Sequence, residues 1–120
     1  MSNEISTISG NQISNSVVGT HMENIQLTIQ SLPAGKSELR EALEKLKNHA
    51  SPMLGELPKE HAEDTAQDLE DFTKEVVKER PHKGKVQDTG KRLIETAQSV
   101  AKYAPTVIES VEKIKHLLGF

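Results

Sequence analysis

The residues with the clearest chemical potential are Gly35, Lys36 and Ser37, which lie between a predicted strand and a predicted helix. A Gly-Lys-Ser sequence at such a junction is typical of a P-loop, in which backbone amides and the lysine hold phosphate groups. A complete P-loop also requires Gly at position 30, where this chain has Gln30, and Pro33 removes one amide donor. The motif is incomplete, and we expect neither a bound nucleotide nor any other cofactor.

The five histidines lack the spacing of a metal site. None has another His or a Cys four residues away, the spacing that would place two ligands on one helix face, and the chain contains no Cys. We interpret His61, which has Glu60 and Glu63 beside it, as a surface residue. The sequence therefore predicts no zinc site and no disulfide. The histidines are His21, His49, His61, His82 and His116.

Basic residues cluster between positions 78 and 92. Such a cluster can bind phosphate groups, but no aromatic residue lies among them to stack on a base, and the net charge of the chain is −3. We interpret the cluster as a solvated loop and expect no nucleic-acid partner. No nucleophile, base and orienting group can be assembled, so we expect no enzyme. The cluster consists of Lys78, Arg80, His82, Lys83, Lys85, Lys91 and Arg92.

Apolar residues at helical spacing predict a mainly α fold for residues 32–120, a helical hairpin followed by a long C-terminal helix. The hairpin helices are expected near residues 33–48 and 58–80, where prolines suit a first turn. Pro105 either kinks the last helix, over residues 86–118, or starts a new segment. The result is a bundle of three to four helices. Its expected core contains Leu69, Phe72, Leu93, Val100, Ile108 and Val111.

The second hairpin helix is expected to be amphipathic. Its apolar stripe includes Leu69 and Phe72, and its opposite face carries acidic residues. The predicted solvent face consists of Glu60, Asp64, Asp68, Asp71 and Glu75.

Residues 1–31 differ from the rest of the chain, because they are rich in Ser, Asn, Thr and Gly. Ile8, Ile13 and Val18 are five residues apart, with a small polar residue two positions before each. This period resembles that of pentapeptide β-solenoids, in which the aliphatic residue of each pentad points inward. Stacked repeats need at least about three units to bury a core, and three pentads do not close one four-sided coil. We therefore expect several chains to contribute.

The same segment also fits a simple strand, because polar and aliphatic residues alternate from Asn24 to Ile29. Low charge, β-branched residues and amide side chains are typical of stacking strands. Ser16 to Gly19 with Met22 resembles the RIP homotypic interaction motif of amyloid-type signalling proteins, although Val17 and Met22 replace its Gln and Asn. A disordered leader is the alternative to a β segment that pairs between chains. The predicted assembly residues are Ile8, Ile13, Val17, Val18, Ile25, Leu27 and Ile29.

The whole layout, a β leader over residues 1–31 and a helical domain over residues 32–120, resembles bacterial accessory modules that accompany STAND-type or other effector proteins. This resemblance implies a self-assembling adaptor in defence signalling, with an effector or other protein docked on the helices. The alternative is a small antitoxin-like regulator that binds one partner protein. Without an apolar run of membrane-spanning length or a signal peptide, we expect a cytoplasmic protein. The predicted docking residues are Ala97, Ala101, Ala104, Leu117, Leu118 and Phe120.

Overall fold

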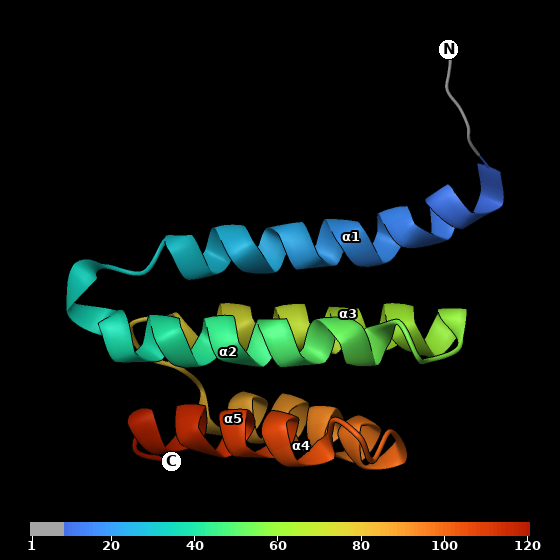
Figure 1. Cartoon of the computed structure of the whole chain (residues 1–120). Helices are drawn as coiled ribbons and strands as arrows, with labels where there is room; N and C mark the ends of the chain where they lie inside the picture. The colour runs from blue at the N-terminus through green and yellow to red at the C-terminus, as the bar shows by residue number, and fades with distance from the viewer. Residues whose placement is uncertain (1–8) are drawn as a thin grey trace.

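The computed structural model describes the backbone of residues 9–120 and the side chains from Val17 onward. Figure 1 shows that this part of the chain is a stack of α-helices, and it contains no strand within residues 9–120. The predicted helical bundle is therefore confirmed. The elements in order are α1 (Ser9–Gln30), the 3-10 helix η1 (Ala34–Lys36), α2 (Ser37–Leu54), α3 (Lys59–Val76), α4 (Lys83–Ser99) and α5 (Ala104–Leu117).

The helices form three layers, with α1 on one side, α2 and α3 in the middle, and α4 and α5 on the other side (Figure 1). Helix α1 packs mainly on α3 and also on α2, while α5 packs on α2 and α4 packs on α3. The principal dimensions are 49 × 32 × 20 Å. Helix α1 thus covers the outer face of the α2–α3 layer and the other four helices close around one another.

Helix α1 occupies most of the segment that the sequence predicts as a β leader, so the single chain has a helix there instead of a strand. The physical reason is a second spacing in the same residues. Val18, Met22, Ile25, Ile29 and Leu32 are alternately four and three residues apart, a repeat that places them along one helix face. Ile25, Ile29 and Leu32 are buried, and Met22 packs against the same core. In a strand these five side chains would be divided between two faces.

One hydrophobic core joins both predicted domains. Ile25 and Ile29 of α1 belong to the same buried cluster as Leu69, Phe72 and Val111. The predicted boundary after residue 31 therefore coincides with the end of α1 and does not separate two cores.

The predicted core residues are mostly buried. Leu69, Phe72, Leu93 and Val111 have at most 1% of their surface exposed, whereas Val100 and Ile108 are half-buried and pack less completely. Val107, one position before Ile108, is fully buried in α5.

Gly90 permits a close approach of α4 to its neighbours. A Cβ atom at this position would lie 3.1 Å from Val111 Cγ1 and 3.3 Å from Phe72 Cε1. Because both neighbouring side chains are fully buried, any larger residue at position 90 would push apart α3, α4 and α5.

Two prolines set the helix boundaries differently from the simplest expectation. Pro52 lies inside α2, which continues to Leu54 although the sequence predicts an end near residue 48. Pro105 lies in the first turn of α5, where its missing amide is tolerated. Of the two alternatives for Pro105, the start of a new segment is correct, since α4 ends at Ser99 and α5 begins at Ala104.

Candidate functional site

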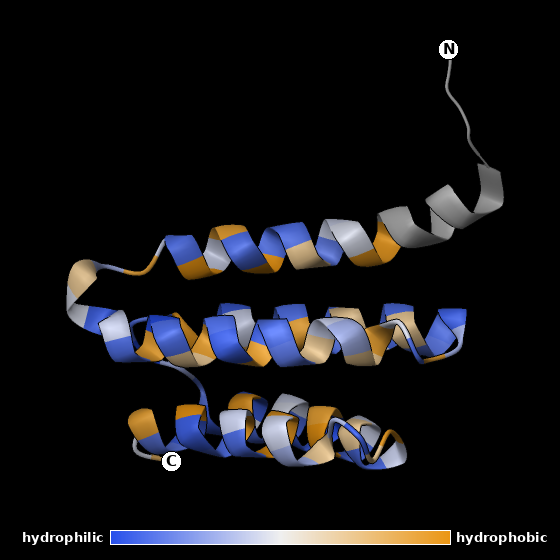
Figure 2. Ribbon diagram, viewed as in Figure 1, coloured by the Kyte–Doolittle hydropathy of each residue, from blue (hydrophilic) through white to orange (hydrophobic). Residues whose placement is uncertain are grey.

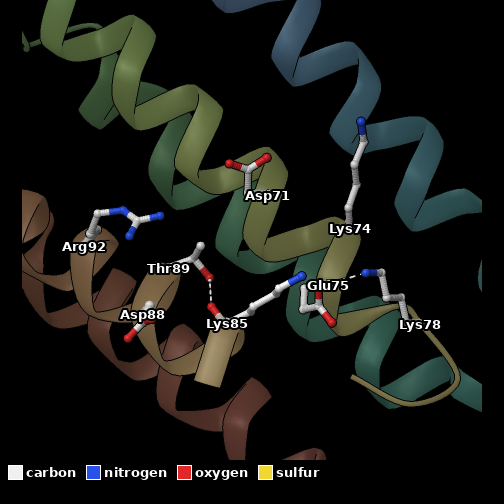
Figure 3. A pocket seen from close by; sticks show the side chains of 8 residues that line it. All are labelled: Asp71, Lys74, Glu75, Lys78, Lys85, Asp88, Thr89 and Arg92. Carbon is white, nitrogen blue, oxygen red and sulfur yellow. Dashed lines mark hydrogen bonds and ion pairs between the residues drawn. The ribbon is translucent and has the colours of Figure 1, made fainter. Parts of the chain in front are cut away.

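A hollow with a volume of about 390 Å³ lies between α3 and α4. Figure 3 shows its charged walls and the hydrogen bond that Thr89 Oγ1 donates to the Lys85 carbonyl oxygen at 2.8 Å. Carboxylates and cations alternate along the hollow, so its walls carry both signs of charge. The lining residues are Asp71, Lys74, Glu75, Lys78, Lys85, Asp88, Thr89 and Arg92.

Several of these charges already have partners within the protein. Lys78 Nζ lies 3.0 Å from Glu75 Oε1, and Arg92 Nε lies 3.1 Å from Asp68 Oδ1. Lys74 points away from the hollow toward α1 (Figure 3), where it pairs with Glu70. A charged ligand would have to displace these ion pairs, so the geometry does not favour the hollow as a binding site.

Glu75 is buried although the sequence places it on the solvent face of this helix. Its Oε2 accepts a hydrogen bond from the His82 backbone amide at 2.8 Å, which ties the loop after α3 back onto the helix. This hydrogen bond lowers the pKa of Glu75, burial raises it, and the contact with Lys78 lowers it further, so that the pKa is below its ordinary value. Part of the predicted basic loop is therefore held by a buried carboxylate.

A second cluster of polar side chains joins α1 to α3. Glu70 of α3 is 4% exposed, and its Oε1 accepts a hydrogen bond from His21 Nδ1 at 2.6 Å. Asn24 Nδ2, one turn along α1, donates to Glu70 Oε2 at 3.4 Å. Lys74, four residues after Glu70 on the same helix, pairs with Oε2 as well. Both oxygens of a buried carboxylate therefore receive donors, two of them from α1.

The charge state of Glu70 follows from these contacts. Burial raises the pKa of Glu70, but the hydrogen bonds from His21 and Lys74 and the positive charge of Lys74 lower it by more. The net pKa lies below the ordinary value, so the group is ionised at neutral pH. A buried carboxylate that loses such partners is strongly destabilising, and the docked position of α1 is what supplies two of them.

Helix α1 also contacts α2 through Lys47, whose ammonium donates to Gln26 Oε1. After α1, the Arg40 guanidinium donates to the Leu32 carbonyl oxygen and secures the turn into α2. The register of α1 on the α2–α3 layer is thus fixed by side-chain contacts on both sides.

The outer face of α1 carries exposed aliphatic side chains. Leu27 is 59% exposed and Val17 is 39% exposed, and among the described side chains they are the large hydrophobic residues that face solvent. Figure 2 shows orange and blue bands alternating along α1, as expected for an amphipathic helix. The exposure of Leu27 contrasts with the burial of Ile25 and Ile29 on either side of it.

The predicted assembly residues therefore fall into three groups. Ile25 and Ile29 are buried in the core, Val18 is half-buried, and Val17 and Leu27 are exposed. Ile13 lies in α1, but its side chain is not among those described, and Ile8 lies outside the described residues.

The predicted docking residues do not form one free face. Ala97 is buried in α4. Because α4 ends at Ser99, Ala101 lies in the exposed connection between helices and Ala104 is the first residue of α5. The remaining three, at the C-terminal end, are half-buried and pack against the core: Leu117, Leu118 and Phe120.

Sequence reasoning missed the joint between α1 and α3. The signal that reveals it is the alternating four- and three-residue spacing from Val18 to Leu32, with His21 and Asn24 beside that seam. Glu70 was not identified, although it lies between Leu69 and Phe72 on the buried side of its helix.

No family model matches this chain, and no curated protein or solved structure is significantly similar to it. Among the described residues, no helix has the length and apolar character needed to cross a membrane. Within the same part of the chain, no three His, Cys, Asp or Glu side chains are grouped as metal ligands.

Proposed function

We propose that this chain is a non-enzymatic adaptor that assembles with copies of itself through its N-terminal segment and docks a second protein on its helical bundle. The observation that carries this proposal is the 59% exposure of Leu27 in the middle of an otherwise buried aliphatic series. When the segment is helical, Ile25 and Ile29 lie in the core of the bundle and Leu27 faces solvent. A strand would place all three side chains on one face.

Helix α1 is poorly suited to stand alone as a helix. It contains Gly19, many Ser, Asn and Thr residues and several β-branched residues, and it has no acidic residue in its first turn and no basic residue in its last. Its stability must therefore come from packing on α3 and α2 rather than from intrinsic helix propensity. When such a segment leaves the bundle, another partner that buries the same aliphatic residues replaces the packing that it loses.

In the assembled form we place this segment as a β-strand that pairs between chains. Ile25, Leu27 and Ile29 then form one continuous aliphatic face, while Gln26, Thr28 and the other polar residues form hydrogen-bonded ladders. The helices that remain carry the docking function. The resemblance of the segment to amyloid-type signalling motifs favours bacterial defence signalling as the setting.

The experiment compares Leu27→Lys with Gln30→Lys by sedimentation and electron microscopy. Both side chains are exposed in the bundle, so each change should alter its unfolding free energy by no more than about 0.5 kcal/mol. Leu27→Lys places a charge on the aliphatic face of the strand and should abolish large assemblies. Gln30→Lys places the same charge on the opposite face and should preserve them. Equal assembly by the two variants would contradict the proposal.

A second function, an antitoxin-like regulator that binds one partner protein, is favoured by the core that α1 shares with the other helices. A chain with a closed core is complete as a monomer and has no need of further copies. Light scattering of the parent chain separates the two functions, because the adaptor forms large assemblies and the regulator stays a monomer or dimer.

A further inference from the structure

When α1 leaves the bundle, it uncovers a groove on the α2–α3 layer, which we call the α2–α3 groove. Glu70 marks the α3 side of this groove, because it contacts α1 directly. Ala66 and Thr73 lie one turn before and after it on the same face, and both are buried. Lys47 marks the α2 side through its contact with Gln26.

The floor of the groove is shaped for a helix. Small residues on α3, Ala66 and Thr73, allow a neighbouring helix to approach closely. On α2, the residues one turn to either side of Lys47 are Leu43 and Ala50, each 1% exposed in the closed chain. Leu43 and Ala50 belong to the same buried cluster as Ile25 and Ile29 of α1.

An occupant of the groove must also supply a hydrogen-bond donor to the Glu70 carboxylate. Once α1 has left, the Glu70 carboxylate retains Lys74 but loses the hydrogen bonds from His21 and Asn24. An occupant that brings a new donor to this position satisfies the carboxylate, whereas an apolar or acidic one leaves it short of partners.

We propose that the α2–α3 groove is the docking site of the bundle, and that its occupant is an amphipathic helix of a partner protein that takes the place of α1. The chemistry of that helix follows from the groove. It carries aliphatic residues alternately four and three positions apart, and a basic or amide residue four positions before the central aliphatic, where it meets Glu70. This inference rests on the proposed function, because the release of α1 is the step that both require.

A partner helix can compete with α1 because α1 is a weak helix. Gly19 makes no close contact, and a Cβ atom at this position would meet nothing within 4 Å. A helix with Ala at the corresponding position fits the groove equally well and gains a factor of about five in helix stability. Docking of such a helix and release of the N-terminal segment are then a single exchange.

The probe for this exchange is a fluorescent synthetic peptide that spans residues 17–32 and carries Gly19→Ala. We expect it to bind the full-length parent chain and to accelerate assembly. A peptide with His21→Asp brings a carboxylate toward Glu70 and should bind the parent about 100-fold more weakly. The full-length Glu70→Lys variant should reverse this order and prefer the His21→Asp peptide. The same order of affinity on both chains would overturn the inference.

A second arm keeps the native groove and does not depend on the folding of Glu70→Lys. Because the chain contains no Cys, Gln26→Cys with Lys47→Cys can be bridged by a bis-maleimide crosslinker, which adds one cysteine thiol to each maleimide and holds α1 in place. The bridged chain should bind no peptide, and the same double variant without the crosslinker should bind it. Equal binding by the two forms would show that the peptide binds elsewhere and would overturn the inference.

The outcomes separate this inference from the proposed function. Peptide binding with the expected reversal, but without assembly at any concentration, supports the groove and contradicts the self-assembling adaptor. Assembly of the parent chain without any peptide binding supports the adaptor and overturns the groove as its docking site.

Discussion

The buried side of α1 is tested most sharply by Ile25→Ala, with Leu27→Ala as its matched control. The two residues are two positions apart on one helix, yet Ile25 is 1% exposed and Leu27 is 59% exposed. Truncation of a buried Ile costs about 2–5 kcal/mol through lost burial and the cavity left behind. The exposed site should change the unfolding free energy by no more than about 0.5 kcal/mol.

For a chain of 120 residues, a change of 1 kcal/mol shifts the thermal midpoint by about 4 °C. Ile25→Ala should therefore lower Tm by about 8–20 °C and Leu27→Ala by about 2 °C or less. Thermal unfolding is measured by circular dichroism at a concentration too low for assembly. Equal shifts for the two variants would refute the docked position of α1. A small shift for Ile25→Ala alone would show that α1 is not part of the cooperative core.

Three further predictions concern the rest of the bundle. Gly90→Ala should lower Tm, because the added Cβ would lie 3.1 Å from the buried Val111 side chain, whereas Gly84→Ala, whose added Cβ would meet only the exposed His82 ring, should lower it less. Phe72→Ala should reduce the unfolding free energy by about 3–5 kcal/mol, and an unchanged denaturant midpoint would place the ring outside the core. The pKa of Glu70 is held below its ordinary value of 4.5 in the fold, so its stabilising contribution is present above pH 4.5 and is lost as the pH falls through the lower folded-state value. Glu70→Gln should therefore weaken the fall in urea midpoint between about pH 7 and pH 3, and an undiminished fall would contradict the role of this carboxylate.

Much of the helical bundle follows from periodicity. The stripe through Leu69 and Phe72 predicts the buried face of α3, and the spacing of Leu93 and Val111 predicts the helical segment that the structure divides into α4 and α5. The proline-based boundaries were less predictable, because the effect of a proline depends on where the hydrogen-bond ladder already ends. Pro52 is accommodated within α2, while Pro105 begins α5.

The N-terminal segment is predicted as a β segment but is helical in the single chain, because its composition and its packing give opposite indications. Ser, Asn, Gly and β-branched residues favour an extended chain, and Ile8, Ile13 and Val18 suggest a period of five. The seam from Val18 to Leu32 fits a groove on α3 that only the folded bundle provides, and this tertiary packing overrides local propensity.

The joint at Glu70 was hidden for a related reason. The predicted solvent face of α3 includes Glu75, and Glu70 is predicted on neither face, because a carboxylate alone gives no sign of the donors that allow its burial. Glu70 and Glu75 are instead buried with donors from other segments, His21 for one and the His82 amide for the other. A contact between residues 49 positions apart in sequence follows only once the packing of α1 on α3 is known.

The central claim is that the N-terminal segment is a helix in the single chain and a strand between chains in the assembly. X-ray diffraction from sedimented, aligned assemblies of the full chain tests it most directly. The claim predicts a meridional reflection at about 4.7–4.8 Å, the spacing of strands stacked along a fibril, from assemblies of the parent chain and of Gln30→Lys, and no sedimentable assemblies from Leu27→Lys. Assemblies that form readily yet lack this reflection would contradict the claim and show that the copies join as intact helical bundles.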